Sequence, residues 1–251
     1  MRQALILAAG VGSRLRPLTD SIPKALVPFR GRPLLEWLIL RLKKEGFQRL
    51  VINLHHYPEQ IKRFVEQRNS FDLDIRFSYE ENLLDTGGAI KKAAPEFDPD
   101  FPLLVHNADI VSTIPLAGLF DLHRKKKAAA TLAVNQRKTT RYLLFNTDMR
   151  LCGWENTKSG EHLWVEAFKN MPCRPYAFCG IHILSPALIG QFTDAECFSV
   201  IPEYLRLAES ERILAHDLSR YSWADMGSME KIKEAEALFS TEKLLLMTKL
   251  S

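Results

Sequence analysis

The residues best suited to chemistry lie near the start of the chain, in a glycine-rich loop. The segment Gly10-Val11-Gly12-Ser13-Arg14 directly follows the apolar run Ala4–Ala9. Glycines after a buried strand let the backbone approach a ligand closely, and exposed N–H groups there can hold phosphate oxygens. The Gly-Lys-Ser/Thr ending of a P-loop is absent, and Leu15 stands where a dinucleotide fingerprint needs a third glycine. The spacing therefore indicates a phosphate-binding loop of another kind or an ordinary tight turn.

Two cations follow this loop. Arg14 and Lys24 lie in a stretch that also holds Pro17, Pro23 and Pro28. Proline fixes one backbone dihedral, so these residues stiffen the segment that carries the charges. A rigid, basic, glycine-rich segment is suited to hold a triphosphate, and we predict that role for it.

Two aspartates are candidates for a metal site. Asp109 comes after the apolar stretch Leu103–Val105, and Asp225 lies in Trp223–Gly227, ahead of the last helical segment. Ligands of open α/β sheets bind where the strands end, so Asp109 is expected at that edge. Two converging carboxylates would suit Mg²⁺, which prefers oxygen ligands and phosphates. Helix capping or a turn is the alternative role for each aspartate.

The elements that must position these residues alternate between strand and helix over residues 1–128. Continuous apolar runs predict buried strands at Ala4–Ala9, Leu50–Leu54, Ile75–Tyr79 and Leu103–Val105. Helical spacing predicts helices over Pro33–Glu45, Pro58–Gln67 and Ala89–Ala94. This alternation indicates βαβ units around a mostly parallel sheet.

The pattern changes after about residue 128, where strands follow one another with few helices between them. Strands are predicted at Ala129–Asn135, Tyr142–Phe145, Leu163–Phe168 and Phe178–Leu184. Helices are predicted over Pro186–Phe192, Val200–Ala208 and Met229–Met247. We expect the second part to extend the first sheet, so that residues 1–251 form one α/β domain.

Composition narrows the class of protein. The 251 residues are 46% hydrophobic and 25% charged, which excludes whole-chain disorder, collagen and a coiled coil. The net charge of +4 is spread along the chain, and its one dense cluster, Arg124–Lys127, is typical of a solvated helix end. We therefore expect no nucleic-acid partner. The four cysteines form no C-x-x-C pair and are expected to be reduced thiols in a cytoplasmic protein. No apolar stretch approaches the ~20 residues of a membrane helix, so no membrane partner is expected either.

The motifs taken together resemble the signature of sugar-1-phosphate nucleotidyltransferases. The resemblance rests first on Leu7-Ala8-Ala9-Gly10-x-Gly12-x-Arg14-Leu15-x-Pro17-Leu18-Thr19 and Pro23-Lys24-x-Leu26-x-Pro28. It continues through most of the chain, in family order, at Val51–Asn53, Asp85–Ala89, Asn107-x-Asp109, Phe178–Ile181 and Trp223–Gly227. Within the family the chain is most similar to the short N-acetylmuramate-1-phosphate uridylyltransferases and the sugar-1-phosphate guanylyltransferases.

The resemblance implies a Rossmann-like three-layer α/β/α fold with a mostly parallel mixed central sheet. It implies a nucleotide-binding half over 1–128, a sugar-binding half over 129–228 and a C-terminal helix over 229–251. The implied reaction joins an NTP to a sugar 1-phosphate with Mg²⁺. We expect UTP and an N-acetylmuramate-type sugar. The alternatives are a guanylyltransferase that uses GTP with mannose or heptose 1-phosphate, and a non-catalytic relative that binds nucleotide sugars.

The same resemblance implies roles for individual residues. The nucleotide would be bound by Ala9, Gly10, Gly12, Ser13, Arg14, Lys24, Glu80, Gly87 and Gly88. Asn107 and Gly180 would meet the sugar or its phosphate, and Asp109 and Asp225 would hold the metal. Arg14, Lys24 and Asp109 are the expected catalytic residues.

Two departures from the family pattern leave the identity of the sugar substrate undecided. Many relatives carry a Glu-Lys-Pro motif in the second half, and here Ala167–Pro172 stands instead, so Lys169 is either a substitute or a surface lysine. The segment Gln136–Glu161 is longer than expected for the short uridylyltransferases. The final stretch Glu242–Leu250 is apolar on one side, and it would pack on the domain or on the second subunit of a homodimer.

Overall fold

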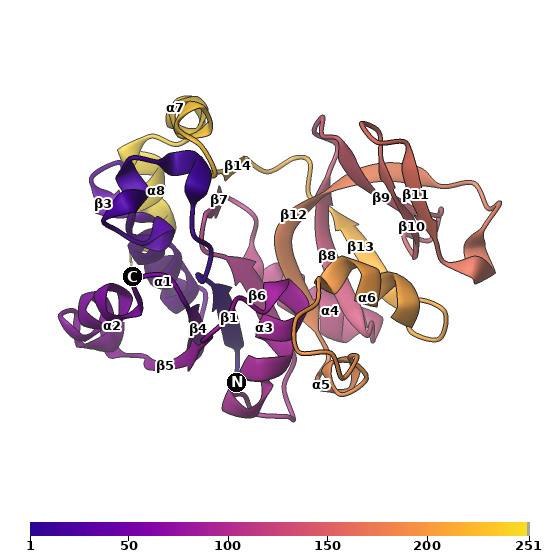
Figure 1. Ribbon diagram of the computed structural model, residues 1–251, viewed down its shortest axis with the longest axis horizontal. Helices are drawn as coiled ribbons and strands as arrows, with labels where there is room; N and C mark the ends of the chain where they lie inside the picture. The colour runs from indigo at the N-terminus through magenta and orange to yellow at the C-terminus, as the bar shows by residue number, and fades with distance from the viewer. Residues whose placement is uncertain (250–251) are drawn as a thin grey trace.

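The chain is built around one ten-stranded sheet, which a computed structural model describes for residues 1–249 (Figure 1). The strand order is β11-β10-β9-β12-β6-β1-β4-β5, while β8 pairs with β12 and β13 pairs with β8. A single sheet thus runs through both parts of the sequence, as expected.

The first part of the sheet is parallel. It contains β1 (Gln3–Leu7), β4 (Arg49–Leu54), β5 (Asp74–Tyr79) and β6 (Leu103–Asn107). The ladders β1–β4, β1–β6 and β4–β5 are all parallel. The connecting helices are α1 (Leu34–Lys44), α2 (Pro58–Glu66) and α3 (Asp85–Ala93). These elements confirm the predicted alternation of strands and helices. The one difference is that α3 begins four residues earlier than expected and so includes Gly87 and Gly88, the glycine pair.

The second part adds six strands, and the long strand β12 joins the two parts. They are β8 (Ala130–Asn135), β9 (Arg141–Phe145), β10 (Leu151–Asn156), β11 (Glu161–Trp164), β12 (Arg174–Leu184) and β13 (Ile213–Asp217). β12 pairs antiparallel with β6 through Ile181–Leu184 and with β9 through Arg174–Tyr176. All strands except β10 and β12 therefore run in one direction, which confirms a mostly parallel mixed sheet.

The second part differs from the sequence prediction in one expected strand and in two strands that were not predicted. The predicted strand Leu163–Phe168 ends at Trp164, and a 3-10 turn follows at Glu166–Phe168. Strands β10 and β13 escape prediction, because both mix polar and apolar residues without clear alternation. The long segment Gln136–Glu161 forms β9 and β10, a pair that lengthens the outer part of the sheet.

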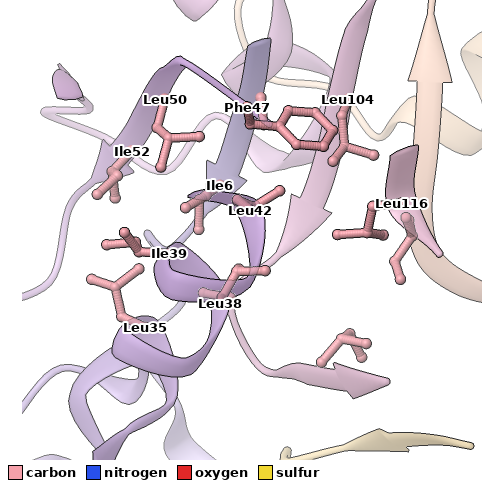
Figure 2. Close-up of a cluster of buried hydrophobic side chains, with 14 of the residues drawn as sticks. Ile6, Leu35, Leu38, Ile39, Leu42, Phe47, Leu50, Ile52, Leu104 and Leu116 are labelled. Carbon is pink, nitrogen blue, oxygen red and sulfur yellow. The ribbon is translucent and has the colours of Figure 1, made fainter. Parts of the chain in front are cut away.

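Helices cover both faces of the sheet and give the expected three layers. Helices α1, α2 and α4 (Leu116–Lys126) share one buried cluster, and α3, α5 (Pro186–Ile189) and α6 (Val200–Leu207) share the other. Alternate residues of β1 divide between the two clusters, because successive side chains of a strand point to opposite faces. Figure 2 shows the first cluster, in which α1 lays Leu35, Leu38, Ile39 and Leu42 against the strands.

The C-terminal segment forms two helices instead of the one expected over 229–251. Helix α7 (Met229–Leu238) and helix α8 (Thr241–Thr248) are separated at Phe239, and residues 250–251 lie outside the described part. The Phe239 side chain is fully buried, and the Ser240 hydroxyl accepts the Lys243 N–H to begin a new helix. Helix α8 packs on α1 and buries Leu244, while Leu246 remains 64% exposed. Within residues 1–249, no helix combines the length and apolar character that a bilayer span requires.

Two buried histidines predict acid sensitivity of the fold. His106 on β6 and His182 on β12 are each 1% exposed, and burial lowers the pKa of both to about 3. Histidine in an unfolded chain has a pKa near ~6.5, so between pH 6.5 and 3 the unfolded state binds more protons. This contribution to stability is complete above pH 6.5 and is lost as the pH falls. At pH 5 the loss is about 2 kcal/mol for each histidine.

Urea unfolding at pH 7 and pH 5 measures this loss. The free energy of unfolding should be lower at pH 5 than at pH 7, and we expect this difference to be smaller in His182→Gln than in the wild type. The exposed His162→Gln is the matched control and should leave the difference unchanged. An unaltered difference in His182→Gln would contradict the assignment.

Candidate active site

The carboxyl ends of the parallel strands enclose a cavity of about 450 Å³. Its walls come from the ends of β1, β4, β5 and β6, the start of α3 and two more distant segments. The lining includes Ala8, Ala9, Gly10, Lys24, Asn53, Glu80, Asp85, Thr86, Asn107, Asp109 and Cys197. This is the edge at which open α/β sheets bind ligands, and it brings together residues from both parts of the sequence.

The glycine loop presents free backbone N–H groups beside this cavity. The N–H groups of Ala8 and Ala9 donate to Asn53 Oδ1 at 2.5 and 3.3 Å. Within residues 1–249, the next backbone N–H along the chain with a protein acceptor is that of Leu15, which donates to the Gly12 carbonyl at 2.8 Å. The N–H groups of residues 10–14 are therefore available to an anion, as a phosphate-binding loop requires.

Gly12 is needed for the shape of this loop. Its φ is +70°, a left-handed conformation that favours glycine. A Cβ there would lie 3.0 Å from the methyl group of Thr19 and 3.1 Å from Cβ of Lys24. The Thr19 hydroxyl also donates to the Gly12 carbonyl at 2.9 Å. The loop and the proline-rich stretch therefore pack as one unit, which places Lys24 against the loop.

Asp109 and Asp225 lie side by side because two short strands pair. β14 (Trp223–Asp225) runs antiparallel to β7 (Ile110–Ser112), and Asp225 stands opposite Ile110. The Met226 N–H donates to the Asp109 carbonyl at 2.8 Å, which fixes the two backbones together. Figure 1 shows this pair of strands above the ends of β1 and β6.

Each aspartate carries a lysine partner. Lys24 Nζ pairs with Asp109 Oδ2, and Lys231 Nζ, from α7, pairs with Asp225 Oδ2. Burial raises the pKa of Asp225, but the hydrogen bond and charge of Lys231, with the charge of Lys24, outweigh it and hold that pKa below its ordinary value. Asp225 is thus ionised at neutral pH, and its Oδ1 also accepts the Gly227 N–H at 2.7 Å.

Arg14 reaches the same place from the glycine loop. Its side chain is exposed, and a Cβ on Gly227 would come within 3.0 Å of Arg14 Nη2 and 2.6 Å of Asp225 Oδ1. Gly227 therefore lets a guanidinium and a carboxylate approach one short backbone segment.

Glu80 and the glycine pair are placed differently from the expectation. Glu80 is 1% exposed, and its two carboxylate oxygens accept from Asn53 Nδ2 at 2.6 Å and from the Leu84 N–H at 3.1 Å. The N–H groups of Gly87 and Gly88 both donate to the Phe198 carbonyl, at 2.9 and 3.3 Å. In this structure the base of a nucleotide would not contact these N–H groups, because the segment that contains Phe198, just before α6, already covers them.

A side chain on either glycine would overlap that covering segment, so their small size serves its packing. Nucleotide binding by Glu80, Gly87 and Gly88 stays a prediction. In this structure their polar groups already form hydrogen bonds within the protein, which a nucleotide would have to replace. Glu80 does line the cavity, together with the neighbouring Asp85, Thr86 and Cys197, whereas Gly87 and Gly88 do not.

On the opposite side, Gly180 and Asn107 lie in contact. Gly180 has φ +70° in an irregular stretch of β12, and a Cβ there would be 2.7 Å from Asn107 Nδ2. The space above the bare glycine is thus filled by Asn107 in place of the expected sugar ring. Lys169 follows the 3-10 turn after β11, pairs with Glu166 at 3.5 Å and is 52% exposed. Whether it reaches a sugar phosphate stays a prediction.

Several residues of this site escape reasoning from the sequence. Asn53 enters it only as part of a motif, although an asparagine at the end of an apolar strand is itself a signal, because once buried it needs hydrogen-bond partners. Lys231 gives no signal, since a single basic residue in a helix is usually a surface charge. Cys197 lines the cavity only because a distant segment folds over α3.

The model of one protein family, described as nucleotidyl transferase, matches residues 3–242. The chain belongs to that family. Among curated members, the N-acetylmuramate alpha-1-phosphate uridylyltransferase of Neisseria meningitidis serogroup B is 39% identical over 94% of this chain and 97% of its own length. The mannose-1-phosphate guanyltransferase of Yarrowia lipolytica is 28% identical over 94% of this chain and 64% of its own length.

Proteins of known structure share the fold. A UDP-glucose pyrophosphorylase solved with UDP-glucose superposes with a TM-score of 0.77 at 16% identity, over 95% of this chain and 98% of that one. Several curated nucleotidyl transferases are longer, and this chain spans less than two thirds of their length. The predicted family and the predicted fold are both confirmed.

Proposed function

We propose that this protein transfers a nucleotidyl group from an NTP to a sugar 1-phosphate. One observation carries the proposal: Gly10, Lys24 and Asp109 line one cavity at the sheet edge. The remaining free N–H groups of residues 11–14 continue the chain from Gly10, and the β7–β14 pairing holds Asp225 next to Asp109. A reaction between two polyanions needs such a set of donors and charges more than it needs a strong base.

In the proposed reaction a phosphate oxygen of the sugar 1-phosphate attacks the α-phosphorus of the NTP. A new oxygen–phosphorus bond forms, the bond to the β-phosphate oxygen breaks, and pyrophosphate leaves. The glycine loop and Arg14 would hold the β- and γ-phosphates. Lys24 would face the α-phosphate or the sugar phosphate and offset the charge that builds up during transfer.

Mg²⁺ is the proposed cofactor, and the residues fit it. Among residues 1–249 no cluster of three or more potential metal-ligating side chains is present. The site we propose would use the two carboxylates of Asp109 and Asp225, whose backbones are held together by the β7–β14 pairing. Mg²⁺ is commonly held by one or two carboxylates together with substrate phosphates, which matches this arrangement. When bound, the ion would neutralise and align the phosphates.

For the substrates we propose UTP and an N-acetylmuramate-type sugar. The support is the 39% identity, over nearly the whole of both chains, to a protein named for that activity. The competing proposal is GTP with mannose or heptose 1-phosphate, because relatives of lower identity are mannose-1-phosphate guanyltransferases. A cytoplasmic enzyme that supplies the cell envelope is part of the first proposal.

A product assay tests both the proposed reaction and the proposed substrates. Each of the four NTPs is combined with a panel of sugar 1-phosphates, and NDP-sugar and pyrophosphate are measured. We expect UTP with N-acetylmuramate 1-phosphate to give the highest turnover, and Asp109→Asn to remove most of it. A clear preference for CTP or ATP would refute the nucleotide assignment. Binding of an NDP-sugar with no turnover on any pair would favour a non-catalytic relative.

A further inference from the structure

Arg137 is a half-buried cation on the sugar-facing side that no role described above uses. It lies between β8 and β9, two residues after the end of β8. Its Nη1 donates to Asn135 Oδ1 at 2.9 Å and its Nη2 to the Phe178 carbonyl at 3.0 Å. Both acceptors are neutral, and no carboxylate within residues 1–249 forms a salt bridge with it.

The guanidinium is held in place by an aromatic ring. Arg137 Cζ lies 4.1 Å from the centroid of the Trp223 ring. Trp223 is itself anchored, because its Nε1 donates to the Cys179 carbonyl at 2.9 Å and its backbone pairs with β7. A stacked guanidinium loses little freedom when it binds a ligand, so this arrangement prepares it for binding.

Arg137 does not line the 450 Å³ cavity, but its contacts connect it to Asp225 and Gly180. Trp223 is two residues from Asp225 on the same strand, and Phe178 and Cys179 lead directly into Gly180, which contacts Asn107. Burial lowers the pKa of Arg137, and the nearby negative charge of Asp225 opposes that effect. The guanidinium therefore lies within electrostatic range of the proposed metal site.

Arg137 still has donors to offer. A guanidinium carries five N–H groups in a planar fork, and the hydrogen bonds above use two of them. Such a fork matches phosphate oxygens in a two-point contact. The present partners of Arg137 are neutral acceptors. An anionic acceptor would bind the remaining N–H groups more strongly, because charge-assisted hydrogen bonds are about twice as strong as neutral ones.

We propose that Arg137 binds the phosphate of the sugar 1-phosphate. This inference rests on the proposed function and adds a substrate-binding residue to it. The NTP phosphates are assigned to the glycine loop, so Arg137 acts on the second substrate alone. It is a binding residue and takes no proton in the reaction.

The experiment compares Arg137→Ala, Arg137→Gln and Arg137→Lys with the neighbouring exposed Lys138→Ala as the matched control. We expect Arg137→Ala to raise the KM for the sugar 1-phosphate by about 10- to 100-fold, the range for loss of a charged hydrogen bond. The KM for the NTP should change less than about twofold. Arg137→Lys should recover only part of the loss, since lysine lacks the fork. Lys138→Ala should behave as wild type.

Calorimetry separates the phosphate from the rest of the sugar and works without turnover. N-acetylmuramate 1-phosphate, mannose 1-phosphate and the two free sugars are titrated into wild-type and variant protein. We expect Arg137→Ala and Arg137→Gln to weaken binding of the sugar 1-phosphate and to leave binding of the matching free sugar unchanged. Melting temperatures and binding of a non-hydrolysable UTP analogue show that each variant is folded.

Three results would overturn the inference. They are an unchanged affinity for sugar 1-phosphate in Arg137→Ala, an equal loss for the free sugar, and no binding of either sugar 1-phosphate by the wild type. Lack of product from the wild type on every substrate pair would instead overturn the proposed function, and the binding data would still report on Arg137.

Discussion

Alanine in place of Lys24 or of Arg14 is expected to lower turnover by at least ~100-fold, the usual effect of removing one charge-stabilising donor. Lys24 reaches Asp109 inside the cavity and its side chain is only 16% exposed, so it acts where water screens charge weakly. Arg14 approaches the same point from the glycine loop, next to Gly227. Steady-state kinetics with saturating NTP and sugar 1-phosphate measures the effect.

The matched control for these variants is Arg16→Ala. Arg16 lies in the same segment, but it is exposed and pairs with Asp20 at 3.2 Å, so its loss should leave turnover nearly unchanged. Lys24→Ala also leaves Asp109 without its cation, and melting temperatures are needed to separate a loss of stability from a loss of catalysis. Near wild-type turnover in both Lys24→Ala and Arg14→Ala would show that the loop assignment is wrong.

The second large effect concerns the aspartate pair. Asp109→Asn and Asp225→Asn are expected to remain folded, to lose most activity, and to need more Mg²⁺ for what remains. Asparagine keeps the size of aspartate and removes its charge, so metal binding should suffer more than folding. Their backbones are fixed by the β7–β14 ladder and by the Met226 N–H, which the substitutions leave in place.

Magnesium titrations of activity test this expectation, with Asp121→Asn as the control. Asp121 is exposed, pairs with Arg2 at 3.3 Å and lies on α4, away from the cavity. Full activity of the wild type in EDTA would contradict the site. The same conclusion would follow if Asp225→Asn had an unchanged Mg²⁺ requirement.

The C-terminal helices have a part in this site that the sequence does not indicate. Lys231 on α7 pairs with Asp225, and α7 and α8 pack with β7, β14 and Leu15 at the end of the glycine loop in a third buried cluster. Arg30 donates to the carbonyls of Glu236 and Phe239 and so holds the end of α7. The segment that follows the motifs therefore helps to set the aspartate geometry.

The sequence by itself determined the parallel half of the sheet and the residues at its edge. Apolar runs of strand length and helices with one apolar face are local patterns, and the carboxyl ends of parallel strands must meet at one edge. These local patterns place the glycine loop and Asp109 at the same edge. The pairing of Lys24 with Asp109 is a finding of the structure. The family motifs extend that placement to Asp225.

Only the tertiary structure decided how distant segments complete the site. The pairing of Asp225 with Ile110 spans more than a hundred residues, and no local periodicity encodes it. The cover over Gly87 and Gly88, and the stacking of Arg137 on Trp223, likewise depend on which loops pack against each other. The prediction of a single C-terminal helix is wrong for the same reason: burial of Phe239 in a cluster built from the whole chain outweighs the local preference for a continuous helix.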